Sequence, residues 1–520
     1  MRFPEKSRSL RSRLALAVGA LALALWGCQS AGGTHEAQLR IALESFPTNL
    51  DPRLATDAYS YDLIETLYNG LVRPAGTGGF EPDLAESLTQ PDPRTFEITV
   101  REGVHFHDGS TLSASDVLCT YRSVMDPLGD SPVRASFDPI QGIEVIDALH
   151  LRIRLREPIA AFRDAMTLPI LPCALIRADH DFRAAPVGTG FLKFVKSQPP
   201  SFIDLEPNAD YFRGKTQLPA VRFRNVPNPT TRVLSLMHGD IDLSMNNVSA
   251  LYVDYLRKKK NLTIQTTPGT NFTYVGFNLQ DPVLRDVRVR RAIAHGIDRE
   301  ELVKYRKRGL ADLAHAILPH GHWAELKDGP RYDYDPEKAR ALLDEAGYPE
   351  PAGGGPRLKL LYKTSQNKDA LRNIEVIRQR LSQIGIEIEI QSYEWGTFFD
   401  QIKRGNFQLY SLSWIGVTDP DFYFSVFHSD QTPENGGRNR GRYSNPEVDR
   451  LFEQARTQMD QEKRADLYRQ AQRILAEDLP YLPLWHERNV AIVSNRVGGF
   501  TLDTLASFRA LESAYLEEAR

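Results

Sequence analysis

The chain has 520 residues, too many for one hydrophobic core, so we expect roughly two to four domains. Hydrophobic residues make up 41% and charged residues 25% of it, which is ordinary for a soluble protein. The formal net charge of −3 leaves no excess of Lys and Arg to neutralise phosphates, which argues against a nucleic-acid scaffold.

The N-terminal residues have the pattern of a secretory signal peptide. Basic residues precede an apolar run of 12 residues, Leu14–Leu25, whereas a bilayer span takes about 20 helical residues. The run ends in Leu25-Trp26-Gly27-Cys28, which resembles the bacterial lipobox, whose Cys is acylated and becomes the mature N-terminus. We therefore expect a signal peptide over 1–27, a lipid anchor at Cys28 and a tether over 28–38. An ordinary signal peptide with a coincidental Cys is the alternative.

Two cysteines follow Cys28, namely Cys119 and Cys173. In an oxidising compartment they either pair or remain buried thiols, and the spacing decides neither, because two Cys form no disulfide framework and no CxxC motif.

The first half of the chain alternates strands with capped helices. A strand over 39–43 leads to a helix that Asp57 caps and that keeps one face apolar. Alternating apolar residues predict further strands, and Ser113 with Asp116 forms a capping box for another helix. The predicted strands and helix that complete this half cover 96–100, 143–146, 149–155, 202–206, 221–226 and 230–238.

The second half has the same alternation with clearer punctuation. Asp335, Pro336 and Gly347 bracket one helix, and Asn445-Pro446 begins another. Residues 407–414 alternate as a strand, and an aromatic helix follows from Phe422. The other predicted strands are 273–278, 358–362, 386–390, 482–484 and 490–493, and the other helices are 281–296, 298–305, 369–384 and 462–477.

Two ordered blocks of residues resemble one family. The first runs Tyr68-x-Gly-Leu-Val, Pro82-Asp-Leu-Ala-Glu-Ser and then Phe96-x-Ile-x-Val-Arg-x-Gly-Val-x-Phe-His-Asp-Gly. The second, residues 275–303, reads VGFNLQDPVLRDVRVRRAIAHGIDREELV. Both are similar to extracytoplasmic solute-binding protein family 5, the dipeptide-, oligopeptide- and nickel-type binding proteins of ABC transporters. The resemblance covers nearly all of the mature chain.

The resemblance implies an α/β fold of the type II periplasmic-binding-protein kind, with two lobes, mixed sheets and an inserted small domain. Lobe I is expected to combine three segments, 39–72, 188–270 and 488–520. The inserted domain is expected over 73–187 and lobe II over 271–487. The resemblance also places His107-Asp108-Gly109 in a structural turn, so we expect no metal there.

We find no motif of an enzyme in the chain. A nucleophile elbow, a zinc-binding His-Glu-x-x-His and a dinucleotide fingerprint are absent from the sequence, and the glycine-rich loop 352–355 lacks a Walker Lys. His315, His320 and His322 lie in a Pro-Gly loop, where solvated histidines are a better interpretation than a metal cluster. We therefore expect no catalysis, no cofactor and no metal; a hydrolase on this scaffold is the contrasting hypothesis.

The resemblance implies ligand capture by hinge closure and delivery to a membrane permease. For the ligand-binding cleft we expect an anchor carboxylate at Asp419 and mainly aromatic walls, formed by Phe46, Tyr274, Asn278, Trp395 and Trp414. The chain departs from the peptide binders at the two usual anchors. Val417 stands where their amine-binding Asp follows the cleft Trp, and Gly396 stands near their carboxylate-binding Arg. A buried ammonium without a partner costs several kcal/mol, so either Asp419 or Asp421 substitutes, or the ligand is no free α-amino peptide.

The expected partners are a peptide or peptide-like solute and the permease and ATPase subunits of an ABC importer. A membrane is contacted through the lipid anchor, outside the cytoplasm, and we expect a monomer. Binding of a non-peptide solute (oligosaccharide, metal chelate or another small polar ligand) and a receptor that feeds a sensor are the alternatives.

Overall fold

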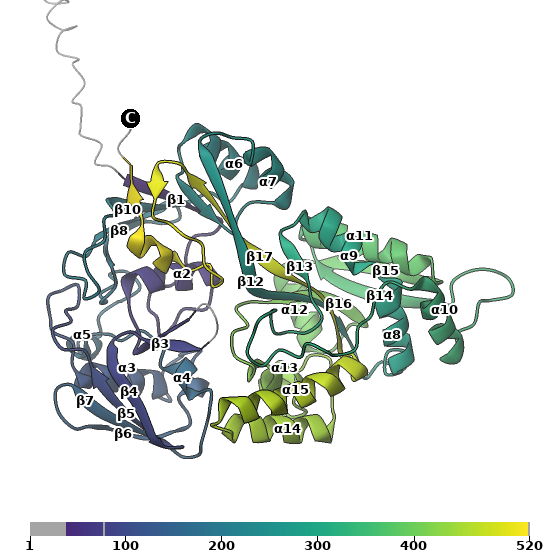
Figure 1. The fold of residues 1–520 in the computed structure, drawn as a ribbon, viewed down its shortest axis with the longest axis horizontal. Helices are drawn as coiled ribbons and strands as arrows, with labels where there is room; N and C mark the ends of the chain where they lie inside the picture. The colour runs from purple at the N-terminus through teal and green to yellow at the C-terminus, as the bar shows by residue number, and fades with distance from the viewer. Residues whose placement is uncertain (1–37, 76–78, 518–520) are drawn as a thin grey trace, which may run out of the picture. The chain divides into compact units, whose positions relative to one another are not determined.

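A computed structural model describes residues 38–75 and 79–517, and one mixed sheet of eleven strands runs through it (Figure 1). The strands follow the order β15-β14-β16-β12-β17-β11-β1-β10-β9-β8, and β13 pairs with β17 off this path. β14 runs parallel to β15 and β16, and β1 runs parallel to β11. The strands are Gln38–Leu43 (β1), Leu192–Gln198 (β8), Phe202–Pro207 (β9), Ala220–Asn225 (β10), Leu243–Met245 (β11), Leu262–Phe277 (β12), Ala311–Leu313 (β13), Leu358–Ser365 (β14), Ile386–Tyr393 (β15), Leu409–Trp414 (β16) and Tyr481–Ser494 (β17).

Two long antiparallel strands join the two halves of this sheet. β12 and β17 pair from Leu262 with Ser494 to Gly276 with Tyr481, with a register shift between Pro268 and Phe272. The sequence analysis predicted only a short strand at 273–278 and two separate strands in β17, and these lengths were wrong. The crossing strands pass from one core to another, so their apolar residues do not keep one face, and periodicity detects only the ends.

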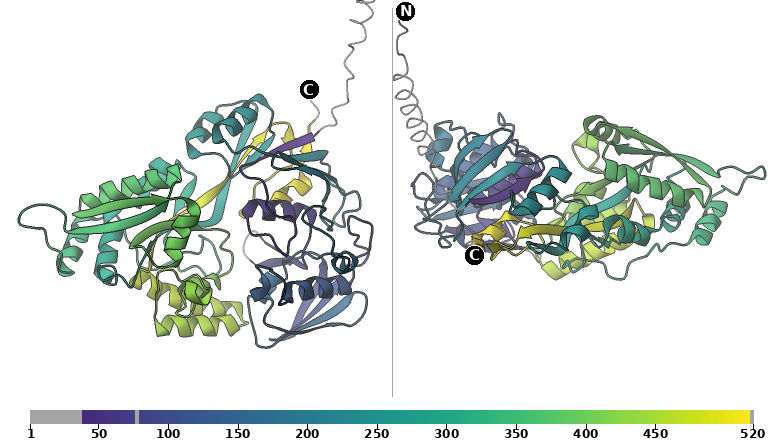
Figure 2. Two further views of the ribbon diagram at one scale, coloured as in Figure 1. Left: turned by 180° about the vertical axis from the view of Figure 1, so that it is seen from behind. Right: turned by 90° about the horizontal axis from the view of Figure 1, so that it is seen from above.

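The half of the sheet with β14, β15 and β16 is covered on both faces, as the views in Figure 2 show. Leu409 of β16 points into one core, whereas Tyr410 and Trp414 point into the other, as the predicted alternation requires. The helices here are Val287–Gly296 (α8), Arg299–Glu301 (α9), Pro336–Glu345 (α10), Lys368–Ser382 (α11), Trp395–Lys403 (α12), Phe422–Phe427 (α13), Pro446–Thr457 (α14) and Gln461–Asp478 (α15).

The predicted helix caps are confirmed. Asp57 accepts a hydrogen bond from the backbone N–H of Ser60, and Asp335 and Asn445 cap α10 and α14 in the same way. Ser113 and Asp116 form the reciprocal capping box. The remaining longer helices are Ala58–Leu67 (α2), Ala114–Met125 (α3), Pro229–His238 (α6) and Ala250–Leu256 (α7).

A separate four-stranded sheet, β4-β5-β7-β6, forms the centre of a smaller core. Its strands are Ala85–Asp92, Thr95–Val100, His150–Leu155 and Ile140–Val145, and its core runs from Leu71 to Ile170. Leu171 and Phe182 pack instead with residues of β1 and α2. Val187 packs against the small core as well as against the core of β1 and α2, so the packing alone sets no sharp boundary. The division into two lobes and an inserted domain stays a prediction.

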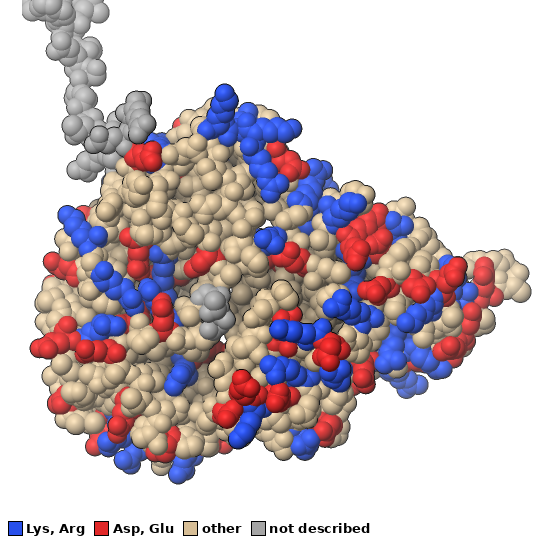
Figure 3. All heavy atoms as spheres, viewed as in Figure 1, with Lys and Arg blue, Asp and Glu red and all other residues tan. Residues whose placement is uncertain are grey.

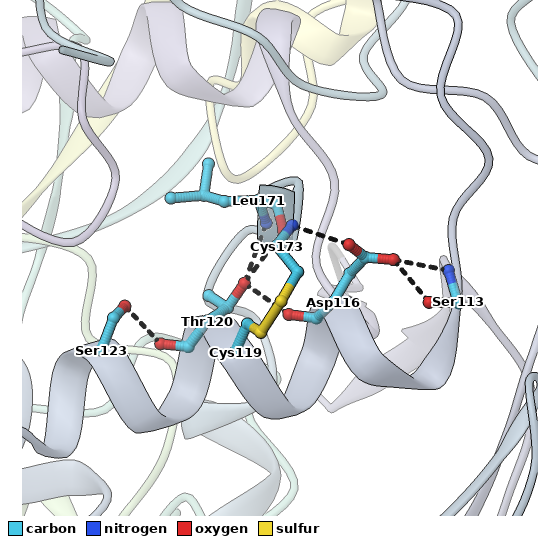
Figure 4. The surroundings of a disulfide bond; sticks show 7 residues. All are labelled: Ser113, Asp116, Cys119, Thr120, Ser123, Leu171 and Cys173. Atoms are coloured by element: carbon cyan, nitrogen blue, oxygen red, sulfur yellow. Dashed lines mark hydrogen bonds between the residues drawn. A yellow bond between two sulfur atoms is a disulfide. The ribbon is translucent and has the colours of Figure 1, made fainter. Parts of the chain in front are cut away.

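Cys119 and Cys173 form a disulfide between α3 and the short helix Cys173–Arg177 (α5), with a Cα–Cα distance of 5.4 Å (Figure 4). Asp116 accepts a hydrogen bond from the backbone N–H of Cys173 at 2.7 Å, and Thr120 accepts one from Leu171 at 3.0 Å. The pairing that the sequence left open is thus present, which suits an oxidising compartment. Within the described ranges, no helix has the length and apolar character needed to cross a membrane.

Candidate ligand-binding cleft

A cavity of about 860 Å³ lies where three parts of the chain meet. One wall comes from α2 and the C-terminal residues 501–513, and a second from residues 73–75, Glu81, 133–137 and 164–169 around the small sheet. Gly416 and Thr418, in the loop that follows β16, complete the lining. The volume lies within the usual range for small-molecule sites, roughly 300–1,000 Å³.

The lining of this cleft carries an excess of negative charge. Its described residues include six carboxylates and two guanidinium groups. The carboxylates belong to Asp62, Glu65, Glu81, Asp164, Asp503 and Glu512, and the guanidinium groups to Arg73 and Arg509. Such a lining favours a ligand with positive charge and disfavours an anion.

The two arginines are placed beside particular acids. Arg73 pairs with Glu81, and its Nη1 lies 3.5 Å from Glu512. Glu65 accepts hydrogen bonds from the Ser507 hydroxyl at 2.6 Å and from the backbone N–H of Phe508. Burial raises the pKa of Glu65, and the charge of Arg509 opposes that rise. These acids are therefore partly neutralised inside the protein.

Asp62 and Asp164 have no direct partner in the described part of the chain, and only the charge of Arg464 partly opposes the rise in the pKa of Asp164. Neither carboxylate has a hydrogen-bond or ion-pair partner among the described residues, although both line the cleft. Burial, followed by the charges of Glu65 and Asp57, raises the pKa of Asp62 well above its usual value. Burial and then the carboxylates of Asp419 and Asp421 raise the pKa of Asp164 to about 7. Asp164 stays open to solvent through the cleft, but the surrounding walls and acids disfavour its charged form.

Two of the aromatic residues predicted for the cleft, Tyr274 and Trp414, lie in the core beside β16. Tyr274 is fully buried and stacks between Trp414, at 6.0 Å between ring centroids, and Tyr481, at 4.0 Å. Trp414 is 8% exposed, with the guanidinium of Arg440 over its ring at 4.3 Å. Its Nε1 is buried without a hydrogen-bond partner in the described part of the chain. Neither ring lines the cavity, so in this structure both pack as core residues.

The two predicted polar residues also have internal partners. The Asn278 amide donates to the carbonyl oxygens of Gly405 at 3.1 Å and Phe407 at 2.9 Å, which fixes the chain entering β16. Asp419 forms a two-pronged ion pair with Arg464, at 2.7 and 3.1 Å. Both Asp419 oxygens are therefore engaged, and the acids that line the cleft without a partner among the described residues are Asp62 and Asp164 instead.

Two of the predicted cleft residues lie away from this cavity. Trp395 is 55% exposed at the start of α12, where its ring stacks on Phe399. Phe46 is partly buried against the core formed by β1 and α2. Cys28 lies outside the described residues.

Sequence reasoning missed Asp62, Glu65, Asp164 and Arg509. The hydrogen bond between Glu65 and Phe508 joins residues 443 positions apart, and no local pattern predicts such a meeting. The only local signal was the Asp62-x-x-Glu65 spacing, which places two acids on one face of α2. That spacing also fits an ordinary solvated face.

A second cavity, of about 320 Å³, lies between residues 315–331 and α15. Its buried polar side chains are already used, because Arg299 donates to the carbonyl oxygens of Ala314 and Pro483, and Gln472 donates to Ala324. The larger cleft, with its unpaired acids, is the better candidate. Within the described ranges, no group of His, Cys, Asp or Glu is suited to hold a metal ion.

Comparison with known proteins decides the family. Residues 79–435 match the family described as bacterial extracellular solute-binding proteins, family 5 Middle. The chain belongs to this family. The oligopeptide-binding protein AppA of Bacillus subtilis is 28% identical over 476 residues, with 87% of both chains covered. Its structure with a nonapeptide superposes with a TM-score of 0.79 at 27% identity, covering 93% of this chain and 99% of AppA. A Listeria monocytogenes ABC transporter substrate-binding protein, CtaP, reaches a TM-score of 0.85 at 25% identity, covering 93% of this chain and all of that one.

Family membership confirms the predicted fold class, an α/β fold with mixed sheets that is shared with periplasmic binding proteins of family 5. The proteins of this family are solute-binding proteins that work outside the cytoplasm. The cleft described above is therefore the candidate solute-binding site.

Proposed function

We propose that this family 5 protein captures a peptide or peptide-like solute in the cleft and delivers it to the permease and ATPase subunits of an ABC importer. The proposal rests on the cavity. Its walls come from the part of the chain around α2 and from the loop after β16, and in the large sheet the path between these two parts runs through β12 and β17. A ligand that contacts both sides stabilises their approach, because it gains contacts on each side only when they close. The named peptide specificity of AppA supports a peptide over another solute.

The chain acts by binding, without catalysis. Reversible capture needs no nucleophile–base pair, and the acids of the cleft are explained by their effect on ligand charge. The protein works as a monomer held at the outer side of a membrane by a lipid on Cys28, which keeps the captured solute close to the permease. The tether composition of residues 28–38 suits that arrangement.

Ligand released from the purified protein, identified by mass spectrometry, tests the proposal directly. A thermal-shift screen with di-, tri- and longer peptides, sugars and metal chelates follows, because a ligand that binds only the folded state raises the melting temperature. We expect peptides to raise it. If only another class of solute does so, the peptide assignment is wrong, and chemical turnover of the released ligand would refute a purely binding role.

A further inference from the structure

We propose that the solute captured in this cleft is cationic, a peptide with basic side chains, and that Asp62 and Asp164 receive its positive groups. This inference rests on the proposed function and adds the charge class of the ligand.

Two acids of the cleft lining keep no partner in the described part of the chain after the internal ion pairs and hydrogen bonds have formed. Arg73 lies between Glu81 and Glu512, and Arg509 lies beside Glu65, so the two arginines of the lining are matched with acids. Asp503 accepts hydrogen bonds from the backbone N–H groups of Leu505 at 3.0 Å and Ser507 at 3.2 Å. Asp62 and Asp164 are left with neither an ion-pair partner nor a hydrogen-bond donor among the described residues. A carboxylate in a confined site without a partner is costly, and a ligand ammonium or guanidinium removes that cost.

The two free acids belong to distant parts of the chain. Asp62 belongs to α2, and Asp164 belongs to the short helix Phe162–Ala165 (α4) beside the small sheet. They come from different walls of one cavity, so a single extended ligand can contact both. Glu65 lies one helical turn from Asp62 and strengthens the negative field at that end.

The segment after β16 brings further carboxylates close to Asp164. Asp419 and Asp421 of that segment act electrostatically on Asp164, and the backbone N–H of Ala160 donates to the carbonyl of Arg456 at 2.9 Å across the same boundary. Arg464 pairs with Asp419, and Arg456 lies 3.3 Å from Asp421. The charge of Arg464 lowers the pKa of Asp164 less than burial and the two carboxylates raise it, and no cation forms an ion pair with Asp164 among the described residues. Bringing these segments together therefore gathers like charges, and a cationic ligand is the component that makes closure favourable.

One run of basic residues lies outside the cleft lining. Arg257, Lys258, Lys259 and Lys260 follow one another at the end of α7, and blue side chains gather over α6 and α7 in Figure 3. The excess negative charge of the cleft is thus local, since the whole chain has a net charge of only −3.

The test compares three tripeptides of equal length: Lys-Ala-Lys, Ala-Ala-Ala and Glu-Ala-Glu. Isothermal titration calorimetry on the purified protein should give the tightest binding for Lys-Ala-Lys and the weakest for Glu-Ala-Glu, with about a tenfold difference at each step. Added salt should weaken the Lys-Ala-Lys complex most, because charge contacts are screened.

Variants then assign the charge preference to residues. Asp62→Asn and Asp164→Asn should each weaken Lys-Ala-Lys binding about tenfold and reduce its advantage over Ala-Ala-Ala, and a cooperative urea unfolding transition verifies that each variant is folded. The matched control is Asp210→Asn, because Asp210 is exposed and outside the cleft and should change neither.

The outcomes separate the two proposals. If neutral or acidic tripeptides bind as tightly as Lys-Ala-Lys, or if both variants keep the preference, the charge inference is overturned while peptide binding stands. If no tripeptide binds and longer peptides of every charge also fail, the proposed function falls, and the charge inference falls with it.

Discussion

Replacing Asp419 by Asn distinguishes a structural carboxylate from a ligand anchor. Its two oxygens meet Arg464 at 2.7 and 3.1 Å, and the side chains of the pair are 16% and 7% exposed. The change leaves a buried guanidinium without its main counter-charge. Removing one partner of a buried ion pair costs about 3–5 kcal/mol. Asp421 remains near Arg464 and offsets part of the loss, so we expect the free energy of unfolding to fall by about 3 kcal/mol.

Urea unfolding followed by tryptophan fluorescence measures this change. The matched control is Asp466→Asn, in the helix that carries Arg464 (α15). Asp466 is 67% exposed, and its ion pair with Arg469 lies at the surface. We expect the control to change stability by less than about 0.5 kcal/mol. The double variant Asp419→Asn with Arg464→Met should recover part of the loss, since it removes the unpaired charge as well.

Ligand affinity supplies the refuting result. With Asp419 held by Arg464, the folded Asp419→Asn variant should bind tripeptides within about threefold of the unchanged protein. If stability is unaltered and affinity falls more than tenfold, Asp419 is the ligand anchor and the structural assignment is wrong.

Four further changes test other parts of the structure. Cys119→Ser removes the disulfide between cysteines 54 residues apart. The lost restriction of the unfolded chain should lower the free energy of unfolding by about 4 kcal/mol. Reductant should lower the melting temperature of the unchanged protein but not of this variant. Burial lowers the pKa of His107 from 6.5 to about 4, so as the pH falls the unfolded chain takes up the proton before the folded chain does. The free energy of unfolding should therefore fall by about 2–3 kcal/mol between pH 6.5 and pH 4. In urea titrations His107→Gln should flatten this pH dependence, whereas His105→Gln, at an exposed position, should not. Gly269→Val overlaps the Glu487 carbonyl in the register shift of β12 and should cost about 1–3 kcal/mol, whereas Gly353→Val enters open space and should cost far less by the same urea titration. Cys28→Ser should move the protein from the membrane to the soluble fraction on cell fractionation; unchanged membrane association would contradict the lipid anchor.

Local chemistry made much of the fold predictable. The caps at Asp57, Ser113 and Asn445 satisfy backbone groups within one helical turn. The alternation within Leu409–Trp414 places side chains on two faces of one strand, whereas Phe407, predicted on the face of Leu409, precedes the strand and packs with Tyr410. Both signals are contained in short windows of sequence.

The cleft was less predictable because its residues come from distant parts of the chain. The resemblance to peptide binders focused attention on Trp414 and Asp419, and the structure gives both internal partners. The free acids Asp62 and Asp164 stand out only when their neighbours are known, since an acid on a helix is ordinarily solvated. What distinguishes them is the absence of a partner among the described residues, and that is a property of the folded chain.

The loop after β16 connects the cleft to the long crossing strands. Its Gly416 and Thr418 line the cavity, and the backbone N–H of Gly416 donates to the Asn271 side chain at 2.9 Å. The N–H of Val417 donates to the carbonyl of Thr270 at 3.3 Å. Both acceptors lie within the register shift of β12, where the regular ladder with β17 is interrupted. The cleft loop is therefore bonded to the stretch of β12 where the ladder is interrupted, and we expect a change in that crossing to move the loop with it.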